Sequence, residues 1–348
     1  MSQDGADKMK GTVKTMKIAV VGSGGWGTAL ALLLLENGND VTLWSFSQQE
    51  SETIRAAKEN PMLKGVPIPD DLKLTSDLNC VKGAALVVLA TPSFAVRETA
   101  KKMAPLLDPE TVVVSVSKGI ENGSFLLLTQ VIEEELGGKN VVAALSGPSH
   151  AEEVGRRVPT AVVAACPDMK VAEWVQDVFM NERFRVYASD DVVGVELGAA
   201  LKNVIALCAG CCDGMGYGDN TKAMLMTRGL TEIARVGEKM GGRKETFAGL
   251  TGMGDLIVTC TSMHSRNRRA GILIGQGVEV HEAMKQVGAV VEGYYAAAAG
   301  YAMSKKVGVE MPITEAAYNV LYNGASVTGV LKMLMTREKK NEIEESWL

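Results

Sequence analysis

The sequence predicts a doubly wound α/β domain followed by an all-α domain. Short runs rich in Val, Ile and Leu alternate in the first half with segments of helical length, as in Lys17–Gly22, Thr28–Asn37 and Asp40–Trp44. Near-continuous apolar runs of this kind are typical of a mostly parallel sheet that is covered on both faces. Their alternation with helices indicates a doubly wound, Rossmann-like arrangement.

Strand-like segments continue along the chain to about residue 187, and the segments after them are helical. Further strands are expected at 86–90, 111–115, 141–145, 160–164 and 184–187. Beyond Asp190 the pattern is helical, with segments at 191–210, 221–240, 268–275, 280–286, 292–306 and 314–322. We therefore expect a polar N-terminal extension at 1–16, a dinucleotide-binding domain at 17–190, an all-helical substrate and catalytic domain at 191–338, and a charged tail at 339–348.

Composition excludes several classes of protein. The chain has 348 residues, 47% of them hydrophobic, and 36 Lys and Arg against 41 Asp and Glu. This mild acidity provides no general attraction to nucleic acid, so no nucleic-acid partner is expected. The longest apolar run, Ala29–Leu35, is far short of the roughly 20 residues that a membrane span needs. The first sixteen residues lack the apolar region of a signal peptide, so we expect a cytoplasmic protein without a membrane span.

The six cysteines do not predict a disulfide framework or a metal site. Cys208 and Cys211 form a C-x-x-C pair inside an apolar helical stretch, without a second pair or a nearby histidine. Zinc sites need further ligands at defined spacing. We therefore expect no metal.

A glycine-rich loop is the first motif that indicates chemistry. Residues 22–27 read G-S-G-G-W-G, directly after the first strand and at the start of a helix. Gly22 permits the tight turn, Gly24 lets a pyrophosphate approach the backbone, and Gly27 lets helix and strand pack closely. The helix N-terminus offers free N–H groups to the phosphates. In this context the motif predicts a dinucleotide site.

The end of the second strand does not decide between NAD and NADP. Trp44 is followed by Ser45, Phe46 and Ser47, and the next acidic residue is Glu50. This loop offers neither an obvious carboxylate for a ribose 2′-hydroxyl nor an arginine for a 2′-phosphate. Phe46 is a candidate to stack on the adenine, with ordinary packing as the alternative.

Two lysines stand out by position. Lys118 is the one cation among the turns that end the later strands, where an open α/β sheet binds its ligand. Lys202 lies in an apolar helical stretch that has no other charge after Glu196. Burial lowers the pKa of an amine, so that it can exchange a proton near neutral pH. The alternatives are an exposed surface Lys118 and a Lys202 whose ammonium reaches solvent.

Two further segments complete the candidate site. Asp255 and Thr259 are four residues apart and share one face if their segment is helical. Asp255 is a candidate partner for a catalytic lysine, with a capping role as the alternative. Residues 265–269 read S-R-N-R-R, a cluster of donors suited to a phosphate dianion.

At these motifs the sequence resembles the NAD(P)-dependent glycerol-3-phosphate dehydrogenases, most closely the bacterial type. The matching stretches are GSGGWGTALA (22–31), SKGIE (117–121), SGPS (146–149), GAALKNVIA (198–206), DGMGYGDNTKA (213–223), GLTGMGDLIVTCTS (249–262), SRNRR (265–269) and VVEGY (290–294). Many bacterial members have His-Arg where this chain has Phe46 and Ser47, which weakens the expectation of a strong NADP preference.

The resemblance implies an activity and a set of roles. Dihydroxyacetone phosphate would be reduced to sn-glycerol 3-phosphate, the backbone of glycerophospholipids, with NAD or NADP as cofactor and no metal. Lys202 would donate and accept the proton, Asp255 would tune it, and Lys118 would contact both substrate and nicotinamide. The implied substrate-binding residues are Lys118, Gly147, Ser149, Lys202, Asp255, Ser265, Arg266 and Asn267. The implied cofactor-binding residues are Gly22, Gly24, Gly25, Trp26, Gly27, Phe46, Lys118, Ala151, Arg266, Val290 and Glu292.

The resemblance also implies a homodimer formed through the helical domain. Two alternatives are a relative in the β-hydroxyacid or 6-phosphogluconate dehydrogenase group, and a nucleotide sensor that has lost catalysis. The S-R-N cluster disfavours the first, and the intact Lys118, Lys202 and Asp255 disfavour the second.

Overall fold

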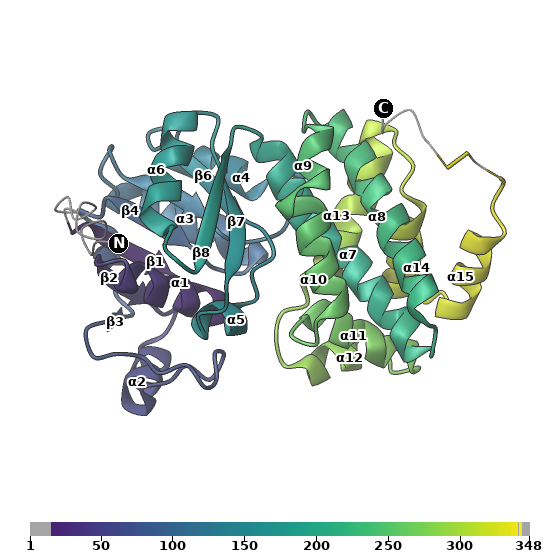
Figure 1. Cartoon of the computed structure of the whole chain (residues 1–348), viewed down its shortest axis with the longest axis horizontal. Helices are drawn as coiled ribbons and strands as arrows, with labels where there is room; N and C mark the ends of the chain where they lie inside the picture. Colours follow the sequence, from purple (N-terminus) through teal and green to yellow (C-terminus); the bar gives the residue numbers. More distant parts are fainter. Residues whose placement is uncertain (1–14, 340, 343–348) are drawn as a thin grey trace, which may run out of the picture.

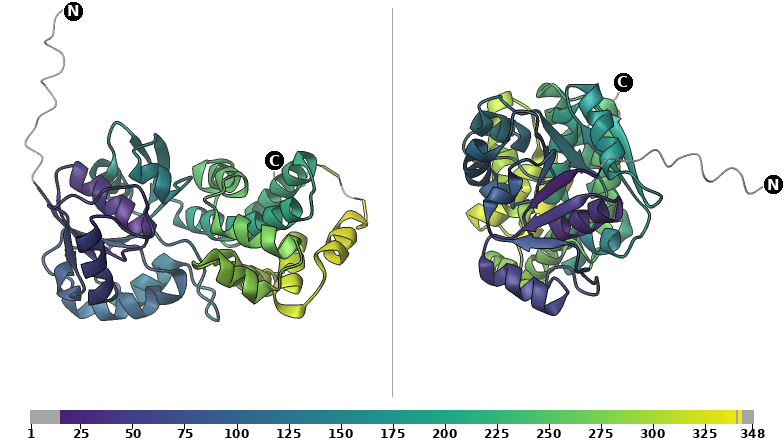
Figure 2. Two further views of the ribbon diagram at one scale, coloured as in Figure 1. Left: turned by 90° about the horizontal axis from the view of Figure 1, so that it is seen from below. Right: turned by 90° about the vertical axis from the view of Figure 1, so that its left-hand side faces the viewer.

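The computed structural model describes residues 15–339 and 341–342, and it contains a sheet domain and a helical domain side by side (Figure 1). The expected extension at 1–16 and the charged tail at 339–348 lie mostly outside the described residues. Two further views show the same two bodies from below and from the side of the sheet domain (Figure 2).

The sheet domain has eight strands in the order β3-β2-β1-β4-β5-β6-β7-β8. The strands are β1 (Lys17–Val21), β2 (Asp40–Trp44), β3 (Lys73–Thr75), β4 (Leu86–Leu89), β5 (Val112–Ser115), β6 (Val142–Ser146), β7 (Thr160–Ala165) and β8 (Phe184–Ser189). The helices between them are α1 (Gly25–Glu36), α2 (Gln48–Ala57), α3 (Val96–Met103), α4 (Leu128–Leu136), α5 (Ala151–Gly155) and α6 (Met169–Phe179). The predicted α/β fold is confirmed, and β3 is a short edge strand that the sequence pattern did not predict.

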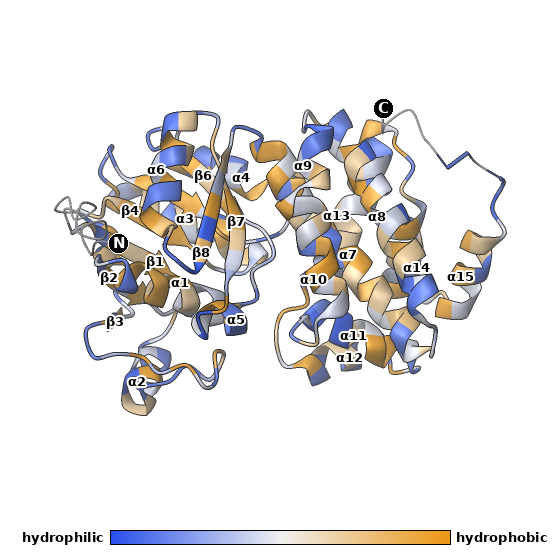
Figure 3. Ribbon diagram, viewed as in Figure 1, coloured by the Kyte–Doolittle hydropathy of each residue, from blue (hydrophilic) through white to orange (hydrophobic). Residues whose placement is uncertain are grey.

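Both faces of this sheet are covered, as the apolar runs predict. Successive residues of β1 enter different cores, because side chains alternate across a strand. Ile18 packs in one core with α1 and α6, whereas Ala19 packs in the other with α3 and α4. In Figure 3 hydrophobic colour dominates at the centre of the sheet, whereas the edge strand β8 includes a hydrophilic segment.

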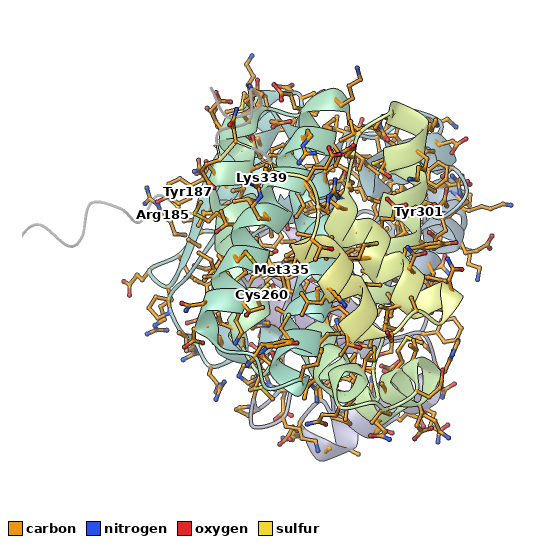
Figure 4. All side chains as sticks on the ribbon, turned by 90° about the vertical axis from the view of Figure 1, so that its right-hand side faces the viewer. Arg185, Tyr187, Cys260, Tyr301, Met335 and Lys339 are labelled. Atoms are coloured by element: carbon orange, nitrogen blue, oxygen red, sulfur yellow. The ribbon has the colours of Figure 1, made fainter. Side chains whose placement is uncertain are left out.

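One pair of strands departs from the parallel arrangement. β6 and β7 are antiparallel, and β8 is parallel to β7. The connection from β6 to β7 contains only the five-residue helix α5. A helix of that length rises about 8 Å, which is less than the length of roughly 17 Å of a five-residue strand. A helix long enough to run the length of the sheet between these strands is thus absent, and the chain reverses direction at β7. At the edge, Arg185 and Tyr187 of β8 point outward and are labelled in Figure 4.

The helical domain is built around α7. Its helices are α7 (Val192–Gly214), α8 (Asp219–Lys239), α9 (Lys244–Ala248), α10 (Asp255–Thr261), α11 (Arg266–Gly275), α12 (Val280–Val287), α13 (Glu292–Val307), α14 (Pro312–Asn323) and α15 (Val327–Met335). α7 packs against α8, α10, α11 and α13. By length and composition α7 could cross a membrane, but 83% of its most apolar window is buried among these neighbours. It is the core helix of this domain.

A buried carboxylate links the two domains. Glu196 of α7 accepts hydrogen bonds from the backbone N–H and the hydroxyl of Thr129, in the first turn of α4. Burial raises the pKa of Glu196 to about 7, against the opposing effect of those donors. The N-terminus of α4 in the sheet domain is thereby attached to the central helix of the helical domain.

The cysteines are free thiols within the described part of the chain. Cys211 is buried in α7, and burial raises the pKa of its thiol to about 12. Cys260, which is labelled in Figure 4, is fully buried in the core of the helical domain.

Candidate active site

The glycine loop connects β1 to α1 at the carboxyl edge of the sheet. Gly22 has a φ of +125°, and a Cβ there would lie 2.6 Å from the carbonyl oxygen of Ala90. A Cβ at Gly27 would lie 1.9 Å from the carbonyl oxygen of Gly22. A Cβ at Gly24 would meet nothing within 4 Å. Gly22 and Gly27 are therefore required for packing, whereas Gly24 faces open space at the N-terminus of α1.

Polar groups around this loop are only partly satisfied. The indole Nε1 of Trp26 and the hydroxyl of Thr91, which follows β4, are buried and have no partner among the described residues. α5 approaches the loop from the other side, since a Cβ at Gly25 would lie 3.6 Å from that of Ala151. These features provide an open backbone and unpaired hydrogen-bonding groups on one edge, which fit a dinucleotide.

A carboxylate that the sequence did not predict for this site lies at the glycine loop. Glu50, in the first turn of α2, accepts a hydrogen bond of 2.8 Å from the Ser23 hydroxyl. The α2 N-cap, Ser47, accepts from the backbone N–H of Glu50 and thereby fixes this turn. Phe46 is 81% exposed and contacts the ring of Trp44 edge-on, with ring centroids 6.4 Å apart.

Three charged side chains meet between the domains. Lys118 follows β5, Lys202 lies in α7 and Asp255 begins α10. The ammonium of Lys202 is 2.5 Å from Oδ1 of Asp255, and that of Lys118 is 2.8 Å from Oδ2. The carboxylate thus bridges two ammonium groups, and the predicted partnership of Asp255 with a lysine is present in the geometry. We call Lys118, Lys202 and Asp255 the two-lysine centre.

Local packing places Asp255 against α7. Residues 250–254 form one turn of π-helix before α10. At Gly198 of α7 a Cβ would lie 2.8 Å from the carbonyl oxygen of Thr251, so only glycine permits this approach. Thr259, on the same face of α10 as Asp255, accepts a hydrogen bond of 2.6 Å from Lys202. That shared face was predicted from the spacing.

Burial sets the electrostatics of the two-lysine centre. It lowers the pKa of Lys202 to about 8, against the opposing effect of the Asp255 carboxylate. Burial alone would raise the pKa of Asp255, but the two ammonium groups outweigh it and hold that pKa below its ordinary value. Asp255 is therefore ionised at neutral pH, and Lys202 is an amine that gains and loses its proton close to neutrality.

The loop after β6 is tied to this centre. The carbonyl oxygen of Gly147 accepts hydrogen bonds from the Lys118 ammonium, at 2.9 Å, and from the Ser149 hydroxyl, at 3.0 Å. Lys118 is half-buried, not an exposed surface lysine. It holds the loop of residues 147–149 beside the carboxylate of Asp255.

The predicted S-R-N cluster divides into different environments at the N-terminus of α11. Ser265 is the N-cap and accepts a hydrogen bond from the backbone N–H of Arg268. The guanidinium of Arg268 forms an ion pair with Asp213, with 2.7 Å between Nε and Oδ2. This arginine therefore stabilises the fold and is not a free donor for a ligand. Arg266 is exposed, and near it lies the carboxylate of Glu292, whose pKa burial raises against the lowering effect of Arg266.

Asn267 is more constrained than the sequence indicates. It is buried, donates a hydrogen bond of 2.8 Å to the side-chain oxygen of Asn203, and accepts one of 2.8 Å from the backbone N–H of Gly293. One amide hydrogen is left for a ligand. Asn267 thus joins α7, α11 and α13.

Glu292 connects the helical domain to the sheet edge. It accepts hydrogen bonds from the Ser93 hydroxyl, at 2.6 Å, and from the Ser93 backbone N–H, at 3.2 Å. Ser93 follows β4 and therefore stands near the glycine loop. Val290 is half-buried in the loop before α13. Within the described part of the chain, no group of three or more His, Cys, Asp or Glu residues is arranged to hold a metal ion.

Comparisons with known proteins agree on one family. Residues 17–172 match the family model described as NAD-dependent glycerol-3-phosphate dehydrogenase N-terminus, and residues 191–332 match the corresponding C-terminus model. The chain is 52% identical over 328 residues to a glycerol-3-phosphate dehydrogenase (NAD(P)+) of Clostridium perfringens, covering 94% of this chain and 99% of that protein. A protein of the same name from Fusobacterium nucleatum is 50% identical, covering 95% of this chain and all of that protein.

The solved structures give the same result. A crystal structure of glycerol-3-phosphate dehydrogenase from Coxiella burnetii superposes with a TM-score of 0.89 at 38% identity, covering 93% of this chain and 99% of that chain.

Proposed function

This chain belongs to the NAD(P)+-dependent glycerol-3-phosphate dehydrogenase family, and we propose that it reduces dihydroxyacetone phosphate reversibly to sn-glycerol 3-phosphate. The family is one of oxidoreductases that use NAD or NADP. In this proposal residues 17–190 hold the cofactor and residues 191–338 supply the proton and most of the substrate contacts. The product would serve glycerophospholipid synthesis.

Lys202 is the proposed proton donor and acceptor. The observation that carries this proposal is the burial of its ammonium against Asp255, with a pKa of about 8. An amine with this pKa is mostly protonated at neutral pH and can protonate a ketone oxygen during reduction. Its neutral form can remove the same proton from the alcohol during oxidation. General catalysts work best when their pKa lies near the working pH.

Asp255 and Lys118 would support that proton transfer. Asp255 keeps the Lys202 ammonium in one orientation, because its carboxylate is fixed from the other side by Lys118. Lys118 provides a second positive charge for an oxygen that becomes negative during reduction. Through the carbonyl oxygen of Gly147 it also positions Ser149, which we propose as a substrate-binding residue together with Gly147.

The N-terminus of α11 is the proposed phosphate subsite. The hydroxyl hydrogen of Ser265, the exposed guanidinium of Arg266 and the remaining amide hydrogen of Asn267 are donors of the kind that phosphate oxygens accept. The helix N-terminus adds a favourable dipole.

Replacing Arg266 tests this subsite. We expect Arg266→Ala to raise the KM for dihydroxyacetone phosphate by roughly 10- to 100-fold, because hydrogen bonds to charged groups contribute about 1.5–3 kcal/mol. Activity with unphosphorylated dihydroxyacetone should change little. Steady-state kinetics with both substrates measure the two KM values, and Arg185→Ala, at an exposed position on the edge strand β8, is the control. An equal loss with both substrates would show that Arg266 does not bind the phosphate.

The residues at the glycine loop fit a nicotinamide dinucleotide, which when bound supplies and accepts the hydride. We propose Gly22, Gly24, Gly25, Trp26, Gly27, Phe46, Lys118, Ala151, Arg266, Val290 and Glu292 as the residues that hold it. The open space at Gly24 and the unpaired indole N–H of Trp26 support this set.

A substitution at Gly24 should weaken cofactor binding without a large loss of stability. We expect Gly24→Ala to weaken cofactor binding by roughly tenfold or more, since a methyl group would occupy the space that the pyrophosphate needs. The loss of stability should stay below about 1 kcal/mol at this helix N-cap. Fluorescence titration with NADH and thermal unfolding measure the two effects. Gly27→Ala is the contrasting variant, because its Cβ would collide with Gly22 and destabilise the fold.

The activity itself is tested by following nicotinamide absorbance with dihydroxyacetone phosphate and either NADH or NADPH. Turnover with one or both would establish the reaction, and their ratio would give the cofactor preference. A folded protein that binds the cofactor without turnover would contradict the proposal.

We also propose that the chain forms a homodimer through its helical domain. α15 supports this, because its sequence is apolar but none of its residues is fully buried. Met333 and Met335 are 49% and 62% exposed, and Met335 is labelled on the outer side of the helical domain in Figure 4. Sedimentation velocity would show a species of twice 36.9 kDa, and a monomer at every concentration would contradict a dimer.

A further inference from the structure

Two histidines meet where the sheet domain faces the helical domain. His150 is the N-cap residue of α5, directly after Ser149, and His264 directly precedes Ser265, the N-cap of α11. Their ring centroids are 5.8 Å apart and the rings are tilted by 53°. This pair therefore bridges the two loops that carry the proposed substrate-binding serines.

His150 has an unsatisfied polar atom. Its Nε2 is buried and has no hydrogen-bond partner among the residues that the structure describes. Buried polar atoms in proteins are nearly always hydrogen-bonded, so an exception of this kind requires an explanation. The third histidine of the chain, His281, is by contrast exposed on α12, and its ring nitrogen lies 3.1 Å from Glu279.

The surroundings keep His150 neutral. Burial lowers the pKa of its imidazole, and the ammonium groups of Lys202 and Lys118 lower it further. The carboxylates of Glu152 and Asp255 act in the opposite direction but do not compensate. Glu152 also lies 3.9 Å from the ring of His264. A neutral imidazole retains one N–H donor and one acceptor.

We propose that Nε2–H of His150 donates a hydrogen bond to a phosphate oxygen of the substrate, with His264 as the residue that positions its ring. This inference rests on the proposed function, and it adds a contact from the sheet domain to the phosphate subsite on α11. His150 lies within the electrostatic influence of both lysines, and its ring contacts the residue next to Ser265. An anion is favoured by the two ammonium groups. A neutral donor binds the anion without adding a third positive charge beside them.

The phosphate is favoured over the other substrate oxygens for a geometric reason. The ketone oxygen must reach Lys202, which already has Asp255 and Thr259 as partners. The ring of His150 instead lies against His264, at the end of the loop that leads into α11. The substrate would thus be held at its phosphate end by residues of both domains.

Kinetics of His150→Phe test the contact, because phenylalanine keeps a planar ring and removes the nitrogen. We expect the KM for dihydroxyacetone phosphate to rise roughly 10- to 100-fold, with kcat changed by less than about threefold. The kcat/KM for unphosphorylated dihydroxyacetone should stay within about twofold of the parent value. His150→Asn, which restores an N–H donor, should recover part of the loss, and His281→Phe is the matched control on the surface.

Three outcomes would overturn the role of His150. These are an unchanged KM, an equal loss with both substrates, and a loss confined to kcat. A parent protein that does not turn over dihydroxyacetone phosphate would instead contradict the proposed function, so the two failures are distinguishable.

A second measurement does not depend on whether His150→Phe folds. The imidazole NMR signals of the parent protein are assigned by elimination, using His264→Gln and His281→Gln, and inorganic phosphate is then added as the probe. We expect saturable movement of the His150 signal and slower exchange of its N–H proton. Movement confined to His281, or no movement at phosphate concentrations that inhibit turnover, would contradict the contact.

Discussion

Lys202→Ala is expected to lower kcat by about 10²- to 10⁴-fold, the range that general acid–base catalysis contributes. Lys202 is the proposed proton donor, and its ammonium lies 2.5 Å from Asp255 in a site that water barely reaches. Binding of NADH should weaken by no more than about twofold, because the glycine loop lies in the other domain. Single-turnover kinetics and fluorescence titration separate these two quantities. A loss of turnover below about tenfold would eliminate the proposed role.

The role of Lys202 as proton donor and acceptor also predicts how the rates of the parent enzyme depend on pH. Burial lowers the pKa of Lys202 to about 8, so its protonated form decreases as the pH rises through that value. The rate of ketone reduction requires the protonated form and should fall above pH 8. The rate of alcohol oxidation requires the neutral form and should rise toward and beyond pH 8. Identical pH profiles in the two directions would contradict a single lysine acting in both.

Lys202→Arg is the matched variant for this experiment. It keeps a positive charge beside Asp255 but has a pKa above 12 and cannot release its proton. We expect stability close to that of the parent protein, together with most of the kinetic loss of the alanine variant. Recovery of activity in Lys202→Arg would indicate that the charge alone matters.

The local sequence singled out Lys118 and Lys202 as candidate site residues more clearly than it indicated their shared partner, Asp255. Lys202 stood out because it is an isolated charge in an apolar helix, and Lys118 because it follows a strand at the edge that binds ligands. The carboxylate that joins them is 53 residues beyond Lys202 and 137 beyond Lys118. Such a contact depends on how α10 packs on α7, which no local pattern records. The sequence therefore left the role of Asp255 undecided between partner and cap.

Other parts of the site show the same limit. The hydrogen bond between Glu50 and Ser23 brings a carboxylate to the glycine loop, although the loop after β2 contains no acidic residue at the usual place. Arg266 and Arg268 look equivalent in the sequence, but Arg268 forms an ion pair with Asp213, near the C-terminal end of α7. Both the Glu50–Ser23 hydrogen bond and the Arg268–Asp213 ion pair are tertiary contacts. The sequence around each of these residues contains no pattern that predicts its partner.

Periodicity in the sequence predicted most strands and helices of the fold, with two exceptions in the sheet. The predicted strands and helices are present within a few residues, since apolar runs and glycine turns mark them directly. The reversal at β7 and the short edge strand β3 were not predicted. A three-residue strand has too few residues for a pattern, and the direction of β7 is a property of its pairing with β6 that its own residues do not encode.

Asp255→Asn should affect both stability and chemistry, which makes it the most informative single change in the two-lysine centre. The variant keeps the shape of the side chain but leaves the buried ammonium of Lys202 and the half-buried one of Lys118 without a negative charge. Breaking a buried ion pair from one side typically costs about 3–5 kcal/mol, so the free energy of unfolding should fall by an amount of this order. Part of that cost is relieved if Lys202 loses its proton.

The kinetic consequence has a definite sign. Asp255 raises the pKa of Lys202 against the effects of burial and of Lys118. Without the carboxylate this pKa should fall below 8, so reduction should lose activity at a lower pH than in the parent enzyme. At pH 7 we expect kcat to fall by roughly 100-fold, because the acid is both depleted and poorly oriented.

Asp191→Asn distinguishes this effect from simple destabilisation. Asp191 is also a buried carboxylate, but it lies away from the lysines: it caps α7 by accepting from the backbone N–H of Gly194, and it also accepts from the backbone N–H of Arg243, before α9. We expect it to lose about 0.5–2 kcal/mol of stability and to keep the pH profile of the parent. Urea unfolding and pH–rate profiles of both variants give the comparison. If Asp255→Asn lost stability but kept the parent's pH profile, Asp255 would be a structural ion-pair partner and not the residue that tunes Lys202.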